Sequence, residues 1–393
     1  MSRILFVTND FPTRRGGIET FVLSLAQNLP PDEVVVYTAS MPGDLEFDAN
    51  LPYPVYRDPA GMLLPTPAVA RRVIKVMRRH ECDRVVFGAS APLGLLAPRL
   101  RRAGARRMVA LTHGHEVWWA RVPLTRQLLR RVGDSVDVMT YVSEWCRERI
   151  APALSPEAAA RMQRLSPGVN TDRFYPGCGG ADVRERLGIP PDAPVVVCTA
   201  RMVKRKGQDT LMRAWPDVLR EVPNARLLLV GDGPNRKHVQ DLARRLGVAD
   251  SVIFTGSVPW EEMPAYTDAG DVFAMPCRTR RGGLDVEGLG IVYLEASATG
   301  LPVVATDAGV LIDDCICGTG DDFLNLHSLA DALDKLCLAG TQFAVEGNQI
   351  ARLQTLREIN TKLVGLILAC SVIDFNVHIA DTLRRRHPRP CYR

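Results

Sequence analysis

Short apolar runs rich in β-branched residues alternate with helix-patterned segments along most of this chain. This alternation is typical of α/β proteins, because a parallel strand can follow another only after a crossover, usually a helix. We expect one set of strands at Arg3–Asn9, Val34–Ala39, Arg84–Phe87, Met108–His113 and Val136–Ser143. A second set is expected at Pro194–Ala200, Leu227–Gly231, Val252–Thr255, Val272–Met275 and Pro302–Thr306.

A stretch rich in Pro and Gly, from Ser166 to Gly180, separates the two sets and indicates a domain junction. The 393 residues also exceed the length at which a single core stops growing. We therefore predict an N-terminal Rossmann-like domain over residues 1–166 and a second over 167–345, facing each other across a cleft. Ligands are expected at the carboxyl ends of the strands. Residues 346–393 form a tail of unassigned type.

Composition places the chain among ordinary globular proteins, with 46% hydrophobic and 24% charged residues. The apolar stretch Leu363–Ala380 contains Asp374, Asn376 and His378, so we expect no transmembrane segment. The first strand begins almost at Met1, which argues against a signal peptide, and the ten cysteines lack paired zinc-ligand spacing. These features favour a reduced, cytoplasmic protein.

Positive charge is concentrated in the first 166 residues, which hold 23 Lys and Arg against 16 Asp and Glu. Such a bias favours an anionic partner, which could be nucleic acid, a membrane surface or a phosphorylated substrate. We find no interleaved aromatics or nucleic-acid module, so we expect no nucleic-acid partner.

The segment Pro67–His80 has the pattern of an amphipathic helix. Its apolar side carries Val69, Val73, Val76 and Met77, and its other side carries Arg71, Arg72, Lys75, Arg78 and Arg79. One interpretation is a helix that covers a sheet and exposes a solvated basic face. The other is a surface that docks on anionic lipid.

Two carboxylates, Glu287 and Glu295, flank a Gly-rich turn at the start of an expected helix. Backbone N–H groups at a helix N-terminus have no intrahelical partner and can bind phosphate. The arrangement suits a nucleotide-sugar, with one acid at the sugar, the amides at the diphosphate and the other acid at the ribose.

Polar motifs also follow several expected strands. Gly16-Gly17 after the first strand predicts either close approach of a ligand to the backbone or a tight turn. Arg201 and Lys206 could neutralise a diphosphate or form a solvated basic loop. For Gly231-Asp232-Gly233 we favour a structural role, with Asp232 as a helix cap.

The motif His113-Gly-His115-Glu116 ends the fourth expected strand. A metal site would need a third ligand with suitable spacing, and none is evident nearby. We therefore favour His113 as a group that contacts substrate.

Together these residues resemble the retaining glycosyltransferases of the GT-B fold. Within that group they are similar to the actinobacterial GDP-mannose-dependent phosphatidylinositol-monomannoside α-mannosyltransferases. The resemblance spans roughly residues 1–309 and rests on Gly16–Glu19, Leu111–Trp119, Thr140–Trp145, Ser166–Val169, Ala200–Met202, Lys206–Asp209, Phe254–Trp260 and Glu287–Glu295.

The resemblance implies roles for these positions in donor binding. Arg201 and Lys206 would hold the diphosphate with help from the Gly17 amide, Glu295 would bind the ribose, and the Val258 backbone would meet the base. The sugar and the distal phosphate would be held by Glu287 and by the amides of Leu289, Gly290 and Ile291.

For catalysis, the resemblance implies that His113 contacts the transferred sugar and that Asp10 lies near the acceptor. Retention in this family is explained by front-face attack, in which the leaving diphosphate helps to take the acceptor proton. The chain contains no D-x-D sequence, which agrees with a family that needs no metal and no cofactor beyond its donor.

The implied activity is transfer of mannose from GDP-mannose to a phosphatidylinositol mannoside lipid, by a protein peripheral on the inner face of the cell membrane. After Val310 the chain departs from the family, because Asp307–Gly320 lacks the usual Gly-Gly-x-Pro-Glu loop. Two alternatives stay open: a GT-B-shaped nucleotide-sugar epimerase and, because of this departure, a non-catalytic remnant that binds nucleotide-sugar or membrane.

Overall fold

The computed structural model describes residues 3–14, 16–280, 285, 287 and 289–305. The chain forms two compact units: the first contains Met1–Pro167 and Arg281–Leu289, and the second begins with Gly168–Arg280 and resumes at Gly290. The departure after Val310 and the tail over 346–393 lie outside the described residues.

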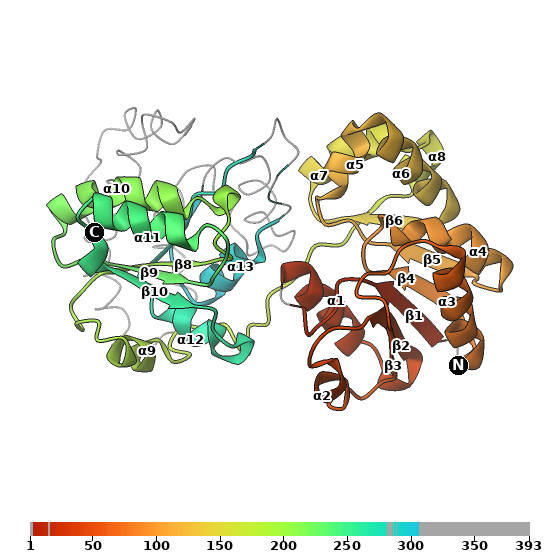
Figure 1. The fold of residues 1–393 in the computed structure, drawn as a ribbon, viewed down its shortest axis with the longest axis horizontal. Coiled ribbons are helices and arrows are strands. Elements are labelled where there is room, and N and C mark those ends of the chain that lie inside the picture. Colours follow the sequence, from red (N-terminus) through yellow and green to blue (C-terminus); the bar gives the residue numbers. More distant parts are fainter. Residues whose placement is uncertain (1–2, 15, 281–284, 286, 288, 306–393) are drawn as a thin grey trace, which may run out of the picture. The chain divides into compact units, whose positions relative to one another are not determined.

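The first unit is built on a seven-stranded parallel sheet with the order β3-β2-β1-β4-β5-β6-β7 (Figure 1). Its strands are β1 Arg3–Thr8, β2 Val34–Ala39, β3 Val55–Asp58, β4 Cys82–Phe87, β5 Arg107–Ala110, β6 Val138–Tyr141 and β7 Gln163–Arg164. All five expected strands are confirmed: β2 has the expected bounds, and the other four differ at one or both ends. The two additional strands, β3 and β7, are short and lie at the edges of the sheet, where little apolar pattern is needed.

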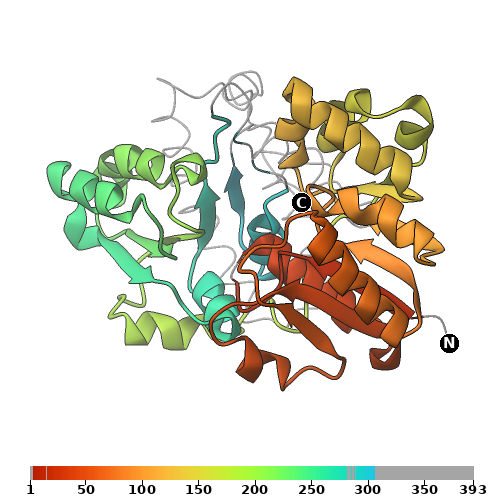
Figure 2. The same ribbon diagram turned by 45° about the vertical axis from the view of Figure 1, so that its right-hand side comes forward.

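Helices cover both faces of this sheet. They are α1 Gly17–Gln27, α2 Asp44–Asp48, α3 Pro67–Arg79, α4 Ala97–Arg102, α5 Glu116–Arg121, α6 Pro123–Ser135, α7 Glu144–Ile150 and α8 Pro156–Ala160, with 3-10 turns at Pro31–Glu33, Leu93–Leu96 and Ala151–Ala153. Helix α1 packs Val22 and Ala26 into a core cluster with Ile4, Phe6 and Val36. Helices α1 and α3 lie on opposite faces (Figures 1 and 2).

The expected amphipathic helix is confirmed as α3. The Thr66 side chain caps it by accepting a hydrogen bond from the Val69 amide, and Pro67 occupies its first turn. Its apolar side is buried at Val69, Val73, Val76 and Met77. The basic residues on the other side are exposed, so the helix covers the sheet whichever role its basic face has.

The second unit contains a five-stranded parallel sheet in its described part, with the order β10-β9-β8-β11-β12. Its strands are β8 Val195–Thr199, β9 Arg226–Val230, β10 Val252–Gly256, β11 Val272–Met275 and β12 Val303–Ala305, which confirms the second expected set. Its helices are α9 Gly180–Arg186, α10 Gln208–Glu221, α11 Arg236–Arg245, α12 Met263–Asp268 and α13 Ile291–Ala298, with 3-10 turns at Lys204–Lys206, Ala249–Ser251 and Trp260–Glu262. Helices α10 and α11 lie on one face and α12 on the other (Figure 1).

Gly231 and Gly233 have the structural role that their pattern indicated. Both have positive φ, and a Cβ at either position would overlap the backbone carbonyl of Ala200 or Met202. Asp232 is not the helix cap that we expected, because α11 begins later and its N-cap residue is Asn235. Instead, Asp232 accepts a hydrogen bond from the Gly233 amide and pairs with Arg236 at 3.0 Å.

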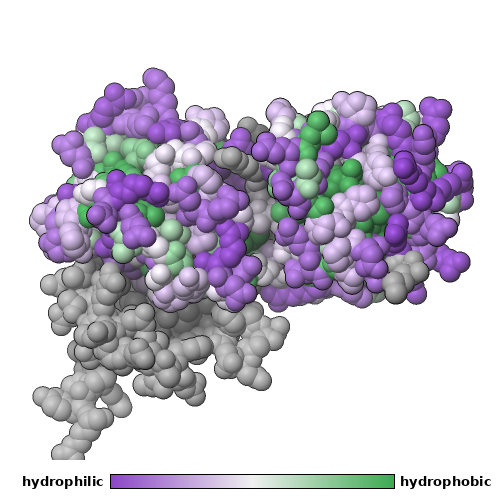
Figure 3. Space-filling view, turned by 90° about the horizontal axis from the view of Figure 1, so that it is seen from below, coloured by the Kyte–Doolittle hydropathy of each residue, from purple (hydrophilic) through white to green (hydrophobic). Residues whose placement is uncertain are grey.

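The face shown in Figure 3 is mostly hydrophilic over the described residues, with hydrophobic side chains in small separate patches. Within the part of the chain that the structure describes, no helix combines the length and apolar character that a membrane crossing requires.

Candidate active site

In the first unit, several of the expected site residues follow the carboxyl ends of the strands. Asp10 lies just after β1, where its amide donates to the Thr8 Oγ1 at 2.8 Å. The Asp10 carboxylate is largely buried and lies 4.0 Å from the Arg14 guanidinium. Its negative charge also acts on His113, which follows β5. The structure therefore brings Asp10 and His113 to one edge of the sheet.

The start of α1 holds an acidic side chain from the helix itself. Glu19 is buried and pairs with Arg14 Nε at 3.0 Å. Gly16 has an extended φ of 171°, so no left-handed turn requires glycine there. A Cβ on Gly16 would overlap the Glu19 carboxylate. Glycine at position 16 therefore leaves space for the Glu19 carboxylate. Contact of the Gly17 amide with a ligand stays a prediction.

The His113 ring is held by three neighbours. Its Nε2 lies 2.6 Å from the Gly88 carbonyl oxygen, and its ring packs edge-on against Phe21 of α1 at 5.8 Å and stacks on His115 at 6.3 Å. A carbonyl can only accept, so Nε2 carries a proton. Burial lowers the pKa of His113, although the Glu116 charge opposes this shift. At neutral pH the ring is therefore uncharged, and its Nδ1 is the acceptor.

Glu116 organises the loop that carries both histidines. Its carboxylate is fully buried and accepts from the Ser90 hydroxyl at 3.0 Å and from the His113 amide at 2.9 Å. It also lies 3.2 Å from His115 Nε2. The sequence pattern did not assign Glu116 this positioning role. Among the described residues, no group of three or more His, Cys, Asp or Glu side chains is placed to hold a metal ion.

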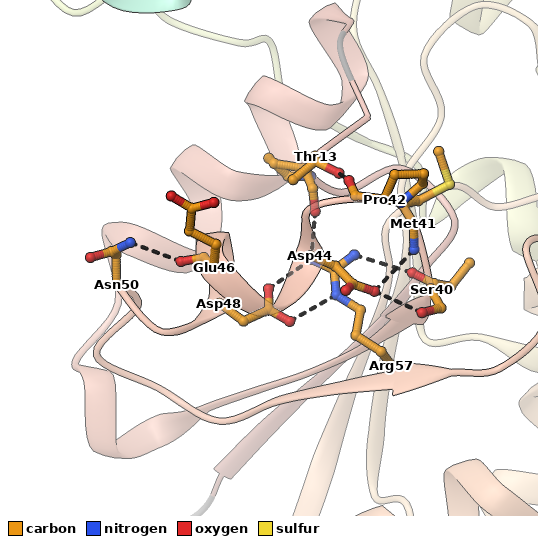
Figure 4. Close-up of polar contacts among 11 residues, drawn as sticks. Thr13, Ser40, Met41, Pro42, Asp44, Glu46, Asp48, Asn50 and Arg57 are labelled. Atoms are coloured by element: carbon orange, nitrogen blue, oxygen red, sulfur yellow. Dashed lines mark hydrogen bonds and ion pairs between the residues drawn. The ribbon is translucent and has the colours of Figure 1, made fainter.

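Arg57 of β3 anchors the loop that follows Asp10 (Figure 4). Its guanidinium pairs with Asp48 of α2 through two bonds of 2.7 and 2.9 Å. It also donates to the Pro12 carbonyl at 2.5 Å and to the Ala39 carbonyl at 3.1 Å. Nearby, the Thr13 hydroxyl donates to the Pro42 carbonyl at 2.6 Å. No local pattern predicts these contacts of Arg57, because β3 itself was not expected.

In the second unit, Lys206 owes its position to the glycine after it. Gly207 has a φ of +77° and opens α10, and a Cβ there would overlap the Pro276 carbonyl oxygen. Lys206 is buried, whereas Arg201 is exposed. The Arg201 carbonyl accepts a hydrogen bond from Gln208 Nε2 at 3.3 Å. Both basic residues follow β8, as expected, but only Lys206 is held within the protein.

Asp209 has a structural partner. Its buried carboxylate accepts two bonds from Arg278 Nη2, at 2.7 and 2.9 Å, and one from Arg213 at 3.1 Å. Burial works against ionisation of Asp209, but the bonds from Arg278 and Arg213 hold its pKa below the usual range. The pair ties the start of α10 to the segment that follows β11.

Helix α13 carries the carboxylate expected to meet the ribose. Its N-cap residue is Gly290, in a left-handed conformation with φ 73°, and no described side chain caps its amides. Glu295 is buried, and this burial raises its pKa to about 7 against the opposing charges of Arg173 and Lys206. Glu295, Lys206 and Arg173 therefore form one electrostatic group.

Val258 lies in the loop after β10, and its backbone amide and carbonyl form no hydrogen bond with any described residue. The next aromatic residue, Trp260, is 38% exposed. Arg173 donates to the Trp260 carbonyl at 2.8 Å and lies over its ring at 5.0 Å. Sequence reasoning missed Arg173, because a linker arginine carries no local motif, whereas Trp260 ends the motif Phe254–Trp260.

The structure thus groups the expected residues in two sets. Asp10, Gly17 and His113 lie in the first unit, and Arg201, Lys206, Val258, Gly290, Ile291 and Glu295 lie in the second. Glu287 and Leu289 are buried and are grouped with the first unit.

Two family models match successive parts of the chain: Glycosyltransferase Family 4 over residues 15–173, and Glycosyl transferases group 1 over residues 181–336. The GDP-mannose-dependent alpha-(1-6)-phosphatidylinositol monomannoside mannosyltransferase of Mycolicibacterium smegmatis is 51% identical over 311 residues, covering 78% of this chain and 81% of that protein. The chain belongs to this family of glycosyltransferases. The Mycobacterium tuberculosis protein of the same name is 48% identical over 316 residues, covering 79% and 81%.

Solved structures agree on the fold of this glycosyltransferase. The crystal structure of Anabaena HepE in complex with UDP has a TM-score of 0.65 at 19% identity, covering 97% of this chain and 99% of that one. WaaG, a glycosyltransferase involved in lipopolysaccharide biosynthesis, has a TM-score of 0.55 at 20% identity, covering 94% and 99%. The expected α/β class with a GT-B fold is confirmed.

Proposed function

We propose that this glycosyltransferase moves a mannosyl group, with retention of anomeric configuration, from GDP-mannose to a phosphatidylinositol monomannoside lipid. Membership in the mannosyltransferase family is the observation that carries the proposal. We assign the acceptor site to the first unit and the donor site mainly to the second.

For the donor, Arg201 and Lys206 compensate the diphosphate, with the Gly17 amide in support. The carboxylate of Glu295 accepts hydrogen bonds from the ribose hydroxyls, and the Val258 backbone, which has no partner among the described residues, meets the base. Glu287 and the amides of Leu289, Gly290 and Ile291 hold the sugar and the distal phosphate. The uncapped, left-handed start of α13 supports the last role.

For the transfer, the bond from the anomeric carbon to the diphosphate breaks as the bond to the acceptor oxygen forms on the same face. The acceptor proton passes to the leaving phosphate oxygen. Neutral His113 accepts a hydrogen bond from a hydroxyl of the sugar through Nδ1, because Nε2 is engaged by Gly88. Asp10 orients the acceptor. In this mechanism the protein supplies orientation and charge stabilisation, and no metal is needed.

We further propose that the protein works as a peripheral protein on the inner face of the cell membrane, with α3 as its docking surface. Arg71, Lys75 and Arg78 are exposed and pair with no described carboxylate. Arg72 differs from them, because it pairs with buried Asp58 at 2.7 Å. Before α3, Met62 and Leu64 are 62% and 50% exposed.

The Asn9 side chain holds the residue between these two apolar side chains. Asn9 Oδ1 accepts from the Leu63 amide at 2.6 Å and Asn9 Nδ2 donates to the Leu63 carbonyl at 3.0 Å. Met62 and Leu64 form an exposed apolar tip, which Asn9 holds through Leu63. Because Asp10 follows Asn9, these bonds connect the apolar tip to the proposed acceptor side of the site. A basic helix beside an exposed apolar tip suits an anionic membrane surface.

Product analysis tests the proposal. The purified chain is incubated with GDP-mannose, UDP-glucose or UDP-galactose, and with phosphatidylinositol monomannoside, phosphatidylinositol or no acceptor. We expect one added hexose in the mass spectrum only with GDP-mannose and the monomannoside. Epimerised sugar without acceptor would indicate the rival enzyme class. Donor binding in calorimetry with no product under any condition would indicate a non-catalytic protein.

A further inference from the structure

The first unit contains a cavity of about 370 Å³ that none of the proposed donor or acceptor residues line. It lies between the end of α5, the first turns of α6 and the turn Ala151–Ala153. Its walls combine the arginines 121, 126 and 130 with apolar atoms of Pro152 and Leu154. No acidic side chain is among the described residues that line it.

The arginines are arranged to present N–H groups to an anion. Arg126 and Arg130 are four residues apart on α6, so their side chains leave the same face of the helix. Arg126 Nη2 donates to the Pro152 carbonyl at 2.6 Å, which holds the guanidinium at the cavity wall. Arg130 forms no ion pair with a described carboxylate. Planar guanidinium groups bind phosphate oxygens through paired N–H bonds.

An apolar surface adjoins the cavity. Leu124, in the first turn of α6, is 70% exposed, and Trp118 on α5 is 38% exposed. Trp118 precedes Arg121 by three residues, so the two share a helix face. These apolar side chains would not contribute to binding of a free phosphate ion, whereas they could contact the acyl chains of a phospholipid.

The surroundings are also basic. Helix α4 packs against both α3 and α6, so the three helices are neighbours. Arg99 and Arg102 on α4 are exposed, whereas Arg101 is paired with Asp137 at 2.9 Å. Exposed positive side chains are therefore also present on a helix that neighbours α6, and they add to the attraction of this unit for an anionic surface.

We propose that this cavity binds the phosphate group of an anionic phospholipid, at a site separate from sugar transfer. The phosphate is held by Arg126 and Arg130, with Arg121 at the edge, and Leu124 enters the acyl region. The inference rests on the proposed function in one respect: the membrane at which the protein is proposed to work supplies the lipid.

Calorimetry with soluble ligands tests this. The probes are inorganic phosphate and dihexanoyl phosphatidylglycerol below its critical micelle concentration. We expect the lipid to bind the wild type, and Arg126→Gln/Arg130→Gln to weaken it by at least about tenfold, as loss of charge-assisted hydrogen bonds requires. Arg106→Gln/Arg131→Gln removes the same charge from exposed positions outside the cavity and should bind like the wild type. Leu124→Ser should weaken lipid but not phosphate.

Arg126 also donates a hydrogen bond to the Pro152 carbonyl, so its substitution could disturb the fold. The single variant Arg130→Gln is therefore measured as well, and thermal unfolding checks that each variant is folded. An absence of lipid binding, equal loss in the control pair, or phosphate binding as tight as lipid binding would each overturn the proposal. GDP-mannose affinity and product formation are measured on the same samples. A wild type that binds the lipid without transferring mannose would refute the proposed function and leave this site standing.

Discussion

At the residue scale, Lys206 and Glu295 carry opposite charges and are both buried in the second unit. The positive charge of Lys206 favours the ionised form of Glu295. In the proposed donor site, the phosphate meets Lys206 and the ribose meets Glu295. Arg201 is exposed and lacks this dependence. Substitutions at the three positions should differ in a way that depends on pH.

We expect Arg201→Ala and Lys206→Ala to lower GDP-mannose affinity by about ten- to a hundred-fold, since each removes a charge-assisted hydrogen bond to the diphosphate. Lys206→Ala should lose more at neutral pH, because it also removes a charge that lowers the Glu295 pKa. Lys204→Ala, an exposed residue in the same turn, is the control. Calorimetry that finds unchanged affinity in both variants would contradict the diphosphate assignment.

Glu295 should make donor binding depend on pH. Its pKa of about 7 means that much of the free protein holds a protonated carboxyl at neutral pH, whereas the ribose hydroxyls favour the ionised form. We expect GDP-mannose affinity to rise as the pH increases through 7 and then to level off. The Glu295→Gln variant should bind weakly, with no such rise. A wild-type affinity that is constant from pH 6 to 8 would contradict this.

The Glu295 carboxyl should also make the stability of the ligand-free protein depend on pH, but in the opposite direction to donor affinity. Its folded pKa of about 7 lies above the ordinary glutamate value of 4.5, so the folded state holds the proton more tightly, and stability falls as the pH rises from about 4.5 through 7. Glu295→Gln should therefore raise the free energy of unfolding of the ligand-free protein at pH 8, by up to roughly 3 kcal/mol. Denaturant unfolding at pH 5 and pH 8 measures the difference.

His113 should affect the chemical step more than donor binding. In the proposed mechanism the ring contacts the transferred sugar, where charge develops in the transition state, whereas the ribose is remote from bond breaking. We expect His113→Ala to lower kcat with little change in GDP-mannose affinity, and Glu295→Gln to do the reverse. If both variants lose only donor affinity, this division of roles is wrong.

At the element scale, the loop between β1 and α1 depends on a strand that the sequence pattern did not reveal. Arg57 of β3 holds Pro12 and Asp48 at once, and its guanidinium lies over the Phe11 ring at 5.6 Å. Its side chain is only 8% exposed. The conformation of the Asp10 segment is thus set by an ion pair from elsewhere in the sheet.

We expect Arg57→Met to impair transfer to the lipid without weakening GDP-mannose binding, because it releases the loop beside Asp10. Loss of the buried pair should also lower the free energy of unfolding by about 3–5 kcal/mol. Arg84→Met is a matched control, since Arg84 pairs with Glu33 at 2.8 Å near the amino end of β4. Equal losses of kcat/KM for the lipid in both variants would show that Arg57 contributes only to stability. Partial recovery of kcat/KM in Arg57→Lys would support a role of Arg57 in positioning the loop beside Asp10.

At the scale of the whole molecule, the basic first half has two kinds of arginine. Arg72 and Arg101 neutralise Asp58 and Asp137, and Tyr37 donates a further short hydrogen bond to Asp58. These arginines belong to the fold and contribute little net charge to the surface. In the proposed function, the exposed Arg71, Lys75 and Arg78 supply the attraction to an anionic membrane.

Substituting Arg71, Lys75 and Arg78 together by Ser should abolish sedimentation with acidic vesicles while leaving GDP-mannose affinity intact. The attraction should weaken in 1 M salt, where the Debye length is about 3 Å. Arg72 is left in place, because its removal would leave Asp58 buried without a counter-charge. Lys237→Ser/Arg244→Ser/Arg245→Ser on α11 controls for lost charge. Equal sedimentation of wild type and the α3 variant would leave this helix as a sheet cover with a solvated face.

Local sequence determined the order of the elements and the residues at the strand ends. Ten strands could be predicted because a buried parallel strand is a continuous apolar run, visible within a short window. The short edge strands β3 and β7 have no such run, so they were missed. Family motifs then indicated His113, Arg201, Lys206 and Glu295.

Only the tertiary structure decided what those residues meet. The tautomer of His113 depends on Gly88, the position of Asp10 on Arg57, and the ionisation of Glu295 on burial beside Arg173 and Lys206. Each partner is distant in the chain and is brought close by the order of the strands in the sheet. A short stretch of sequence does not reveal that order. Hydrophobic periodicity is local and specifies elements, whereas desolvation and charge pairing act through space and set the chemistry of the site.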